Sequence, residues 1–466
     1  MAPAKLTKAQ SVTVTIVMLG GFIIYMSQLT MSPALPVVMQ EFKITAETGQ
    51  WLTSIFLLIA GIMVPVTAYL IGRFSSRQIY MFSMFSFLIG SALAAFSNGF
   101  PMLMAGRILQ ATGSGIIFPF LTVIVMLIFP KARRGFAMGI VGIVMGFAPA
   151  IGPSLSGWIV DIWGWRYVFM IVLPFTVVLI IMAFIKLENT GERYEVRLDR
   201  ISVVLSTVGF SGILYGSSIA GNIGWSSPYV IGSIAVGAAC VVFFVRRELK
   251  SDEPMLNFHI LKNAKFAIST IISGIISSSL TVGAVIVPIY LQTVLGYSAL
   301  DTGLLLIPGA LSMVIISPIS GKLFDRFGPR TLSIIGLWIL TAGSIILSLL
   351  HTNSTFMYVC IGYTLRMLGV SMAGMPITTW GLNMLPNKLI AHGNAVINTM
   401  RQVGGALGIA ILVTVMMMVS TGSGQPEAQA TVMGVNAAFR GSLMLIVIAL
   451  VLTILRVKGD GYAENN

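Results

Sequence analysis

Three arginines stand inside long apolar stretches of the chain, where a charged side chain is costly. They are Arg107, Arg366 and Arg401. A guanidinium in an apolar environment needs hydrogen-bond acceptors, and its planar fork suits carboxylates, phosphates and carbonyl oxygens. The three residues therefore predict either polar contacts that hold helices together or a site for an anionic group.

The acidic residues show the opposite pattern. All fifteen lie in the connections between apolar stretches, at the ends of these stretches or in the C-terminal tail. A carboxyl group inside a membrane can exchange protons because desolvation raises its pKa, and this chain lacks one there. Any proton coupling would have to use an acid near an outer end of a stretch. Glu41, Glu47 and Asp161 are the candidates, and the alternative interpretation is that each is a solvated loop charge.

The elements that position these charges are apolar segments of about 20 residues, the length that a spanning helix needs. The sequence predicts fourteen of them, over residues 12–34, 49–71, 79–98, 102–128, 136–158, 166–187, 201–220, 227–246, 266–292, 302–321, 331–350, 355–379, 391–418 and 437–456. The connections are short, which leaves no room for a separate soluble domain.

Composition supports a polytopic all-α membrane protein. Of the 466 residues, 56% are hydrophobic and only 9% are charged, too few to coat soluble domains. This composition excludes a cytosolic enzyme, a disordered chain and a nucleic-acid-binding protein, despite the net charge of +13. The two cysteines and three histidines indicate no disulfide framework and no metal site. We expect no cofactor.

Orientation follows from the basic residues. With the N-terminus placed in the cytoplasm, 22 of the 28 Lys and Arg residues fall in cytoplasmic loops and tails, and only three in outside loops. Positive charge is retained on the cytoplasmic side of membrane proteins. We therefore expect both termini in the cytoplasm and an even number of spans.

An internal repeat links the two halves of the chain. Residues 65–77 align without gaps to residues 318–330, with a proline, a leucine, a phenylalanine and two arginines in common. Parallel repeats of this kind build two-lobed transporters.

Five motifs resemble the major facilitator superfamily, and in particular its fourteen-span drug:proton antiporter branch, over most of the chain. The loop motif G-x-L-x-D-R-x-G is Gly321, Leu323, Asp325, Arg326 and Gly328. The fourth-span motif R-x-x-Q-G-x-G is Arg107, Gln110, Ala111 and Gly113. The antiporter motif G-x8-G-x3-G-P-x2-G-G is Gly139, Ala148, Gly152, Pro153, Ser156 and Gly157. The other two are residues 163–169 and 401–408.

The resemblance implies a major facilitator fold of two six-helix lobes, residues 1–199 and 248–466, joined by two extra spans within residues 200–247. It also implies conformational roles for the small residues and the loop motif. Gly139, Gly152, Pro153 and Gly157 would set helix packing and bending, whereas Gly321, Asp325, Arg326 and Gly328 would latch the lobes. Asp325 would take a helix N-terminus or a basic partner. Arg401 would have a structural part.

Ser27 departs from the family pattern. Members of this branch typically carry an aspartate a few residues before A-L-P in the first span, and here Ser27 precedes Ala34-Leu35-Pro36. By family geometry Arg107 would face a central cavity near Ser27, Gln28, Thr30 and Ser32. Two interpretations stay open: Arg107 is satisfied by carbonyls, Gln110 and water, or it holds an anionic part of a substrate.

The resemblance implies a membrane transporter that exports amphipathic small molecules by alternating access. The alternative is an exporter or flippase of an anionic or lipid-like molecule, weakly coupled or uncoupled to protons. Gln110, Arg366, Met372 and Trp380 complete the expected binding residues, and Met26, Met31 and Phe118 are further candidates. We expect a monomer in the plasma membrane whose partners are its substrate, the lipid bilayer and, where coupling exists, protons.

Overall fold

The computed structural model describes residues 7–28, 30–190, 199–224, 227–251, 254 and 256–457. Within these ranges the regular structure is helical and contains no strand. The α-helices are α1 (Lys8–Gln28), α2 (Met31–Phe42), α3 (Ala46–Arg73), α4 (Ser76–Ala95), α5 (Phe100–Ile128), α6 (Arg134–Trp163), α7 (Arg166–Met170), α8 (Val172–Lys186), α9 (Arg200–Ile223), α10 (Pro228–Lys250), α11 (Ala264–Thr293), α12 (Ala299–Leu347), α13 (Phe356–Asn383), α14 (Ile390–Gly422) and α15 (Glu427–Arg456). Short 3₁₀ turns η1 (Lys131–Arg133), η2 (Phe258–Lys262) and η3 (Asn387–Leu389) lie between them.

Eleven helices among the described residues are long and apolar enough to cross a membrane, with α7 and α8 taken together as one. The predicted all-helical membrane fold is therefore confirmed. Two predicted spans, 302–321 and 331–350, are the two arms of α12, which breaks at Gly328. The backbone of Gly328 has φ +77°, a left-handed conformation that glycine adopts without a side-chain clash.

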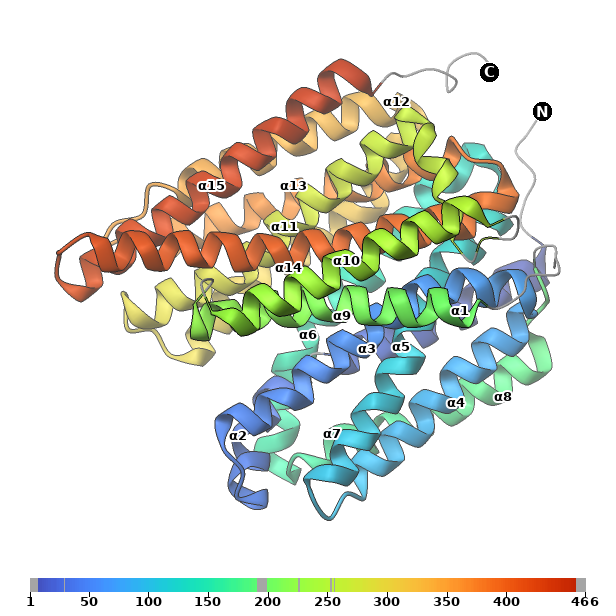
Figure 1. The fold of residues 1–466 in the computed structure, drawn as a ribbon, viewed down its shortest axis with the longest axis horizontal. Helices are drawn as coiled ribbons and strands as arrows, with labels where there is room; N and C mark the ends of the chain where they lie inside the picture. The colour runs from blue at the N-terminus through green and yellow to red at the C-terminus, as the bar shows by residue number, and fades with distance from the viewer. Residues whose placement is uncertain are drawn as a thin grey trace.

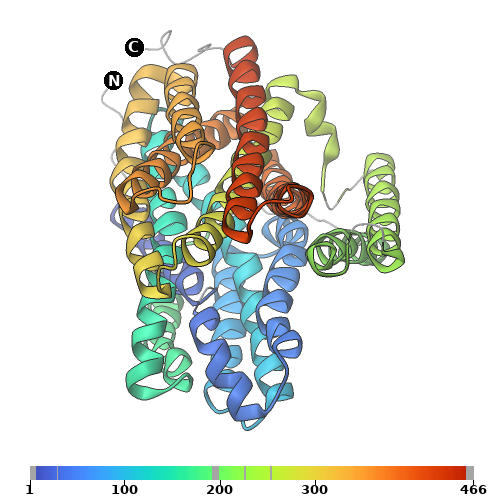
Figure 2. The ribbon, with the colours of Figure 1, turned by 90° about the vertical axis from the view of Figure 1, so that its left-hand side faces the viewer.

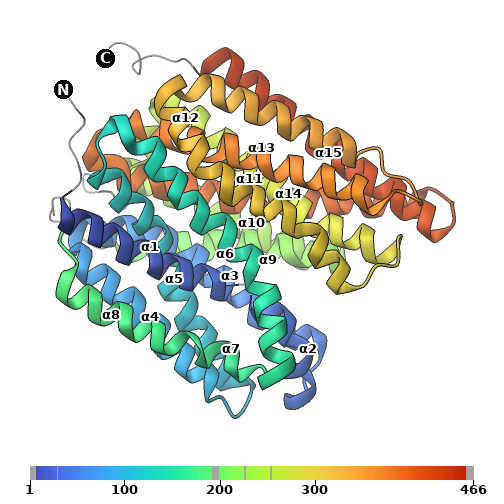
Figure 3. The same ribbon diagram turned by 180° about the vertical axis from the view of Figure 1, so that it is seen from behind.

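The helices gather into two bundles (Figure 1, Figure 3). Helices α1 to α8 make the first lobe and α11 to α15 the second. The lobes lie against each other at the end where α1 begins and α15 ends, and they separate toward the end that carries α2 and α7 (Figure 1). Helices α6 and α12 run side by side across the boundary (Figure 3).

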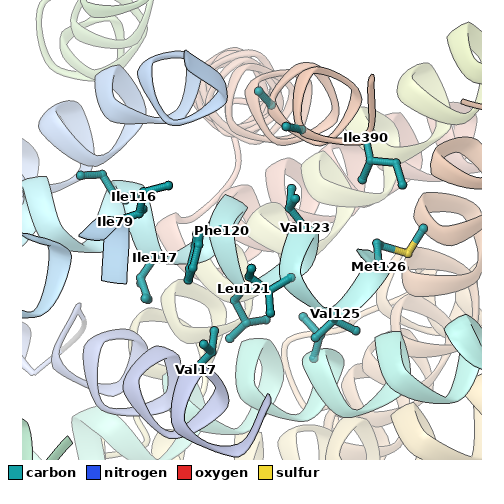
Figure 4. Packing of buried hydrophobic residues seen from close by; sticks show 14 of the residues in the cluster. Val17, Ile79, Ile116, Ile117, Phe120, Leu121, Val123, Val125, Met126 and Ile390 are labelled. Carbon is teal, nitrogen blue, oxygen red and sulfur yellow. The ribbon is translucent and has the colours of Figure 1, made fainter. Parts of the chain in front are cut away.

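The hydrophobic core follows this division. One large cluster contains Val17, Phe120 and Leu121 of the first lobe together with Ile390 and Ile397 of α14, so the two lobes share apolar packing at their joined end (Figure 4). At the opposite end each lobe has a cluster of its own, one around Met31 and Phe169 and one around Tyr290 and Phe439. Apolar burial therefore holds the lobes together at one end.

The internal repeat is visible in the contacts that it makes. Gly328, where α12 breaks, aligns to Ser75, which separates α3 from α4. The second arginine of each copy then binds the end of the last helix of its own lobe: Arg77 donates to the Leu187 carbonyl after α8, and Arg330 to the Ile454 carbonyl of α15. The repeated sequence thus makes the same contact, an arginine bound to the end of the last helix, in both lobes.

Helices α9 and α10 form a hairpin beside the two lobes (Figure 2). An ion pair between Asp199 and Arg247 ties its ends together. On the first-lobe side the rings of Tyr215 and Trp51 stack with centroids 5.9 Å apart. On the other side the buried carboxylate of Glu248 accepts a hydrogen bond from the Leu256 N–H, at 2.9 Å, and so anchors the connection to the second lobe.

Candidate functional site

Arg107 is completely buried in the first lobe, and its hydrogen bonds go to neutral oxygen atoms. Its Nε donates to the Leu52 carbonyl at 3.1 Å, Nη1 to Oε1 of Gln110 at 3.1 Å, and Nη2 to the Gln28 carbonyl at 3.4 Å. The guanidinium also lies 4.3 Å from the ring centroid of Phe56, a cation–π contact. In this conformation Arg107 ties α5 to α3 and to the end of α1.

The break between α1 and α2 lies next to this cluster. Thr30 donates from Oγ1 to the Ser27 carbonyl at 2.9 Å, and Ser156 of α6 donates from Oγ to the Thr30 carbonyl. The Ser27 hydroxyl is buried and has no hydrogen-bond partner among the described residues. The structure therefore groups Ser27, the Gln28 carbonyl and Thr30 around the chain break. The side chain of Ser32 lies outside the described residues.

Arg366 takes the place in the second lobe that Gln110 takes in the first. The packing around two glycines shows this equivalence. A Cβ atom added at Gly90 would meet the backbone N of Gln110, and a Cβ atom added at Gly343 would meet the backbone N of Arg366. The polar partners correspond as well. Gln110 donates from Nε2 to Ser91 at 2.8 Å, and Arg366 donates from Nη1 to Ser344 at 2.5 Å.

Arg366 is also fully buried and held by neutral oxygens. Its Nη2 donates to the carbonyl and to the hydroxyl of Ser279 on α11, at 2.6 and 2.8 Å. The guanidinium lies 5.2 Å from the ring centroid of Phe439. Arg107 and Arg366 thus occupy separate clusters, one in each lobe, and the structure does not bring them together.

Met372 and Trp380 lie in the core of the second lobe. Trp380 is 1% exposed and packs in a cluster with Ile272, Ile276 and Phe324, and Met372 packs against the same cluster. In the first lobe Met31 is fully buried in the outer core cluster, and Met26 is partly buried against the large cluster. These side chains fill apolar cores in this conformation.

Four glycines of α6, of which Gly139 belongs to the antiporter motif, mark a close crossing of α6 and α12. Gly135, Gly139, Gly142 and Gly146 follow one another at spacings of four, three and four residues, so they share one face of α6. A Cβ at Gly139 would collide with the Ser317 carbonyl of α12, and one at Gly321 with the Gly135 carbonyl. Small residues therefore set how closely the two lobes approach along this seam.

The rest of the motif lies beyond the seam. Gly152 is buried, and a Cβ at Gly157 would reach only ordinary contact, 3.9 Å from Pro33 of α2. The side chain of Pro153 lies outside the described residues. Gly139 and Gly157, which belong to one sequence motif, thus face different neighbours.

Asp325 connects the two lobes at the joined end. Its carboxylate accepts hydrogen bonds from the N–H groups of Gly135 and Phe136, both at 2.9 Å, in the first turn of α6. A carboxylate is stabilised there by unpaired N–H groups and by the helix dipole. Next to it Arg326 is exposed and lies over the Phe327 ring. The sequence predicts a helix N-terminus or a basic side chain as the partner of Asp325, and in the structure its hydrogen bonds come from a helix N-terminus.

A second clasp lies beside Asp325. Arg134, the first residue of α6, donates from Nη1 to Oδ1 of Asn383 at 3.0 Å and from Nη2 to Oδ1 of Asn387 at 3.2 Å. Its partners lie at the end of α13 and in η3. The start of α6 therefore binds two separate elements of the second lobe.

Glu41 is engaged in a surface ion pair. Arg166 donates to its two carboxylate oxygens at 2.7 and 3.1 Å, and Trp165 donates from Nε1 at 2.7 Å. These hydrogen bonds lower the pKa of Glu41, with that from Arg166 acting most strongly. Asp161 is exposed at the end of α6, and the side chain of Glu47 lies outside the described residues. A carboxylate held ionised by Arg166 is a poor proton carrier near neutral pH.

The structure adds a group of side chains between the lobes that sequence reasoning did not assemble. Asn394 of α14 donates to the Pro119 carbonyl of α5 at 2.8 Å, and Arg401 lies seven residues later on the same face of α14. Across the boundary the Tyr25 and Phe118 rings lie 4.1 Å apart. The spacing of Asn394, Asn398 and Arg401 was the available signal, since residues four and seven positions apart share a helix face.

A model of the Major Facilitator Superfamily matches the chain twice, over residues 17–207 and 197–409. The chain belongs to this superfamily. The two matches fall on the two halves that the internal repeat relates. As a major facilitator protein, the chain is a multi-pass membrane transporter and not an enzyme.

Several curated major facilitator proteins are similar along almost the whole length. An uncharacterized MFS-type transporter of Bacillus subtilis, YcnB, is 41% identical over 98% of this chain and 97% of its own. The lincomycin resistance protein LmrB of the same organism is 37% identical over 95% of each chain. The multidrug transporter protein MdtP, also from Bacillus subtilis, is 28% identical over 78% of this chain and 68% of its own.

A solved structure shares the fold. The human organic anion transporter MFSD10 superposes with a TM-score of 0.70 at 13% sequence identity, and covers 95% of this chain and 99% of its own. At that identity the likeness concerns the major facilitator fold alone.

Proposed function

We propose that this major facilitator protein exports amphipathic small molecules by alternating access. One observation carries the proposal: the hydrogen bonds between the lobes gather toward one end of the described structure. They join Asp325 to Gly135 and Phe136, Arg134 to Asn383 and Asn387, and Asn394 to Pro119. Lobes that are clasped at one end and apart at the other correspond to one state of a rocking transporter.

We infer fourteen membrane crossings. The inference takes α1 with α2 and α7 with α8 as single crossings, and the two arms of α12 as two. This count supports the fourteen-span branch, with lobes at residues 1–199 and 248–466 and the hairpin of residues 200–247 between them. An even number of crossings, together with the Lys and Arg residues concentrated in alternate loops, supports cytoplasmic termini. The clasped end is then cytoplasmic, and the conformation faces outward.

The substrate class rests on two supports. Relatives with 37% and 28% identity carry the names of lincomycin resistance and multidrug transport proteins, which favours drug-like amphipathic cargo. The alternative is an anionic or lipid-like cargo. It is favoured by Ser27, which stands where the branch typically has a carboxylate and whose buried hydroxyl has no hydrogen-bond partner in the described part of the chain.

We propose secondary active transport in the plasma membrane by a monomer, with protons as the candidate driving ion. The ion pair of Glu41 with Arg166 speaks against this carboxylate as the proton site. Asp161 and Glu47 remain the candidates from the sequence.

The test is transport by the purified chain in proteoliposomes with an imposed pH gradient. One arm uses ethidium, a cationic dye, and the other uses 1-pyrenebutyrate, an anionic amphiphile. We expect gradient-dependent movement of ethidium for a multidrug antiporter, whereas movement of pyrenebutyrate alone supports the anionic alternative. Vesicles that move neither probe, in either gradient direction, would contradict the proposal.

A further inference from the structure

Arg401 differs from the other two membrane arginines in what surrounds it. Arg107 and Arg366 are fully buried and donate to carbonyl, amide and hydroxyl oxygens. Arg401 donates no hydrogen bond and forms no ion pair within the described part of the chain, and its side chain is only partly buried. A guanidinium in such a place keeps its five donors available.

The position of Arg401 on α14 directs it toward the first lobe. Asn394 lies seven residues earlier on the same helix face, and its amide donates to the Pro119 carbonyl of α5 across the boundary. Seven residues advance about 10 Å along a helix, away from the clasped end. Arg401 thus lies farther along α14 than Asn394, away from the clasped end.

The opposite wall at this level is aromatic. The phenol of Tyr25 on α1 and the guanidinium of Arg401 influence each other electrostatically. Tyr25 packs in turn on Phe118 of α5, with ring centroids 4.1 Å apart. The Tyr25 hydroxyl also makes no hydrogen bond within the described residues. Among the described residues, Arg401 of the second lobe therefore interacts with a phenol of the first lobe without a hydrogen bond to it, and that phenol packs on the apolar ring of Phe118.

We propose that Arg401 binds the anionic group of an amphipathic substrate, with Tyr25 and Phe118 packing against the apolar part. This inference rests on the proposed transport function and names the charge that the site selects. A carboxylate suits the planar guanidinium because it can accept two parallel hydrogen bonds. The cost of an unpaired cation at this depth is offset when such a ligand is bound. The assignment differs from the sequence interpretation, which gave Arg401 a structural role, placed Arg366 among the expected binding residues and left open whether Arg107 holds the substrate.

The experiment measures binding by the purified full-length protein in nanodiscs with three pyrene probes of one shape. They are 1-pyrenebutyrate, its uncharged primary amide, and the matching trimethylammonium compound. We expect the wild-type protein to bind pyrenebutyrate at least tenfold more tightly than the amide. Arg401→Gln should weaken pyrenebutyrate binding at least tenfold and change amide binding less than twofold, and Arg401→Lys should restore part of the loss.

Arg440→Gln is the matched control, because Arg440 is exposed on α15. It should bind all three probes as the wild type does. The inference is overturned if the wild type does not distinguish pyrenebutyrate from the amide, or if Arg401→Gln weakens all three probes equally. The comparison of pyrenebutyrate with its amide in the wild-type protein can overturn the inference even where the Arg401→Gln variant does not fold. Charge-selective binding without transport of any probe would contradict the proposed function but would still support an anion-binding site at Arg401.

Discussion

The carboxylate of Asp325 in the second lobe accepts a hydrogen bond from the backbone N–H of Gly135 in the first, at 2.9 Å. This contact depends on two local features. Gly328 turns the chain sharply just after Asp325, and Gly135 has no side chain to keep the carboxylate away. A loop motif and a helix start, 190 residues apart in the sequence, thus form one interlobe clasp.

Asp325→Ala should weaken the clasped state by about 1 to 2 kcal/mol, since it removes both acceptors from the start of α6. The measurement is the distance between spin labels on the two lobes at the clasped end. We expect a second, longer distance to gain population. Arg326→Gln is the control, because Arg326 is exposed and lies over the ring of its neighbour Phe327. An unchanged distance distribution in Asp325→Ala would remove this residue from the clasp.

Gly139→Ala should lower transport strongly, whereas Gly157→Ala should retain it. The added Cβ at Gly139 collides with the Ser317 carbonyl, which is backbone and cannot rotate away, but at Gly157 it meets Pro33 at 3.9 Å. Initial transport rates at equal protein amounts measure the difference. Equal rates for the two variants would show that the α6–α12 seam does not control the transport cycle.

Arg107→Ala should reduce the thermal stability of the protein and abolish transport of cationic, neutral and anionic probes alike. The substitution removes three hydrogen bonds that the buried guanidinium donates to Leu52, Gln110 and Gln28, and hydrogen bonds of a charged group contribute about 1.5 to 3 kcal/mol each. Melting of the detergent-solubilised protein and transport are measured together. A variant of normal stability that loses only anionic probes would instead assign Arg107 to the substrate.

Ser27→Asp should shift the charge preference of transport toward cations. The buried Ser27 hydroxyl has no partner within the described ranges, and the carbonyl of its neighbour Gln28 accepts a hydrogen bond from Arg107, so a carboxylate here would lie near that guanidinium. The measurement is the ratio of ethidium to pyrenebutyrate transport, with Ser27→Asn as the neutral control of similar size. The same ratio in both variants would show that this position does not face the cargo.

Glu41→Gln should reduce stability at neutral pH without abolishing transport. Arg166 and Trp165 lower the pKa of Glu41 in the folded protein, so its ionised form contributes stability above the unfolded-state pKa. That contribution disappears as the pH falls through the folded-state pKa. Melting curves of the variant and the wild type should therefore converge in acid. Loss of gradient-driven transport in Glu41→Gln, with stability intact, would make Glu41 a proton carrier after all.

The sequence by itself determined the class of protein and most of its helices. Apolar segments of about 20 residues can bury their backbone polar groups in lipid only as helices, so length and composition suffice to predict them. The loop motif around Asp325 and the aligned positions Ser75 and Gly328 were also readable, because local backbone rules fix caps and turns.

Only the tertiary structure decided what each charged or polar side chain contacts. The sequence could not tell that Arg366 replaces Gln110 or that Trp380 lies in a lobe core, because neighbours from distant segments set burial. It also could not separate Arg107, held by carbonyl and amide oxygens, from Arg401, left without a hydrogen bond in the described structure. Periodicity places a residue on a helix face, but packing between helices determines what that face meets.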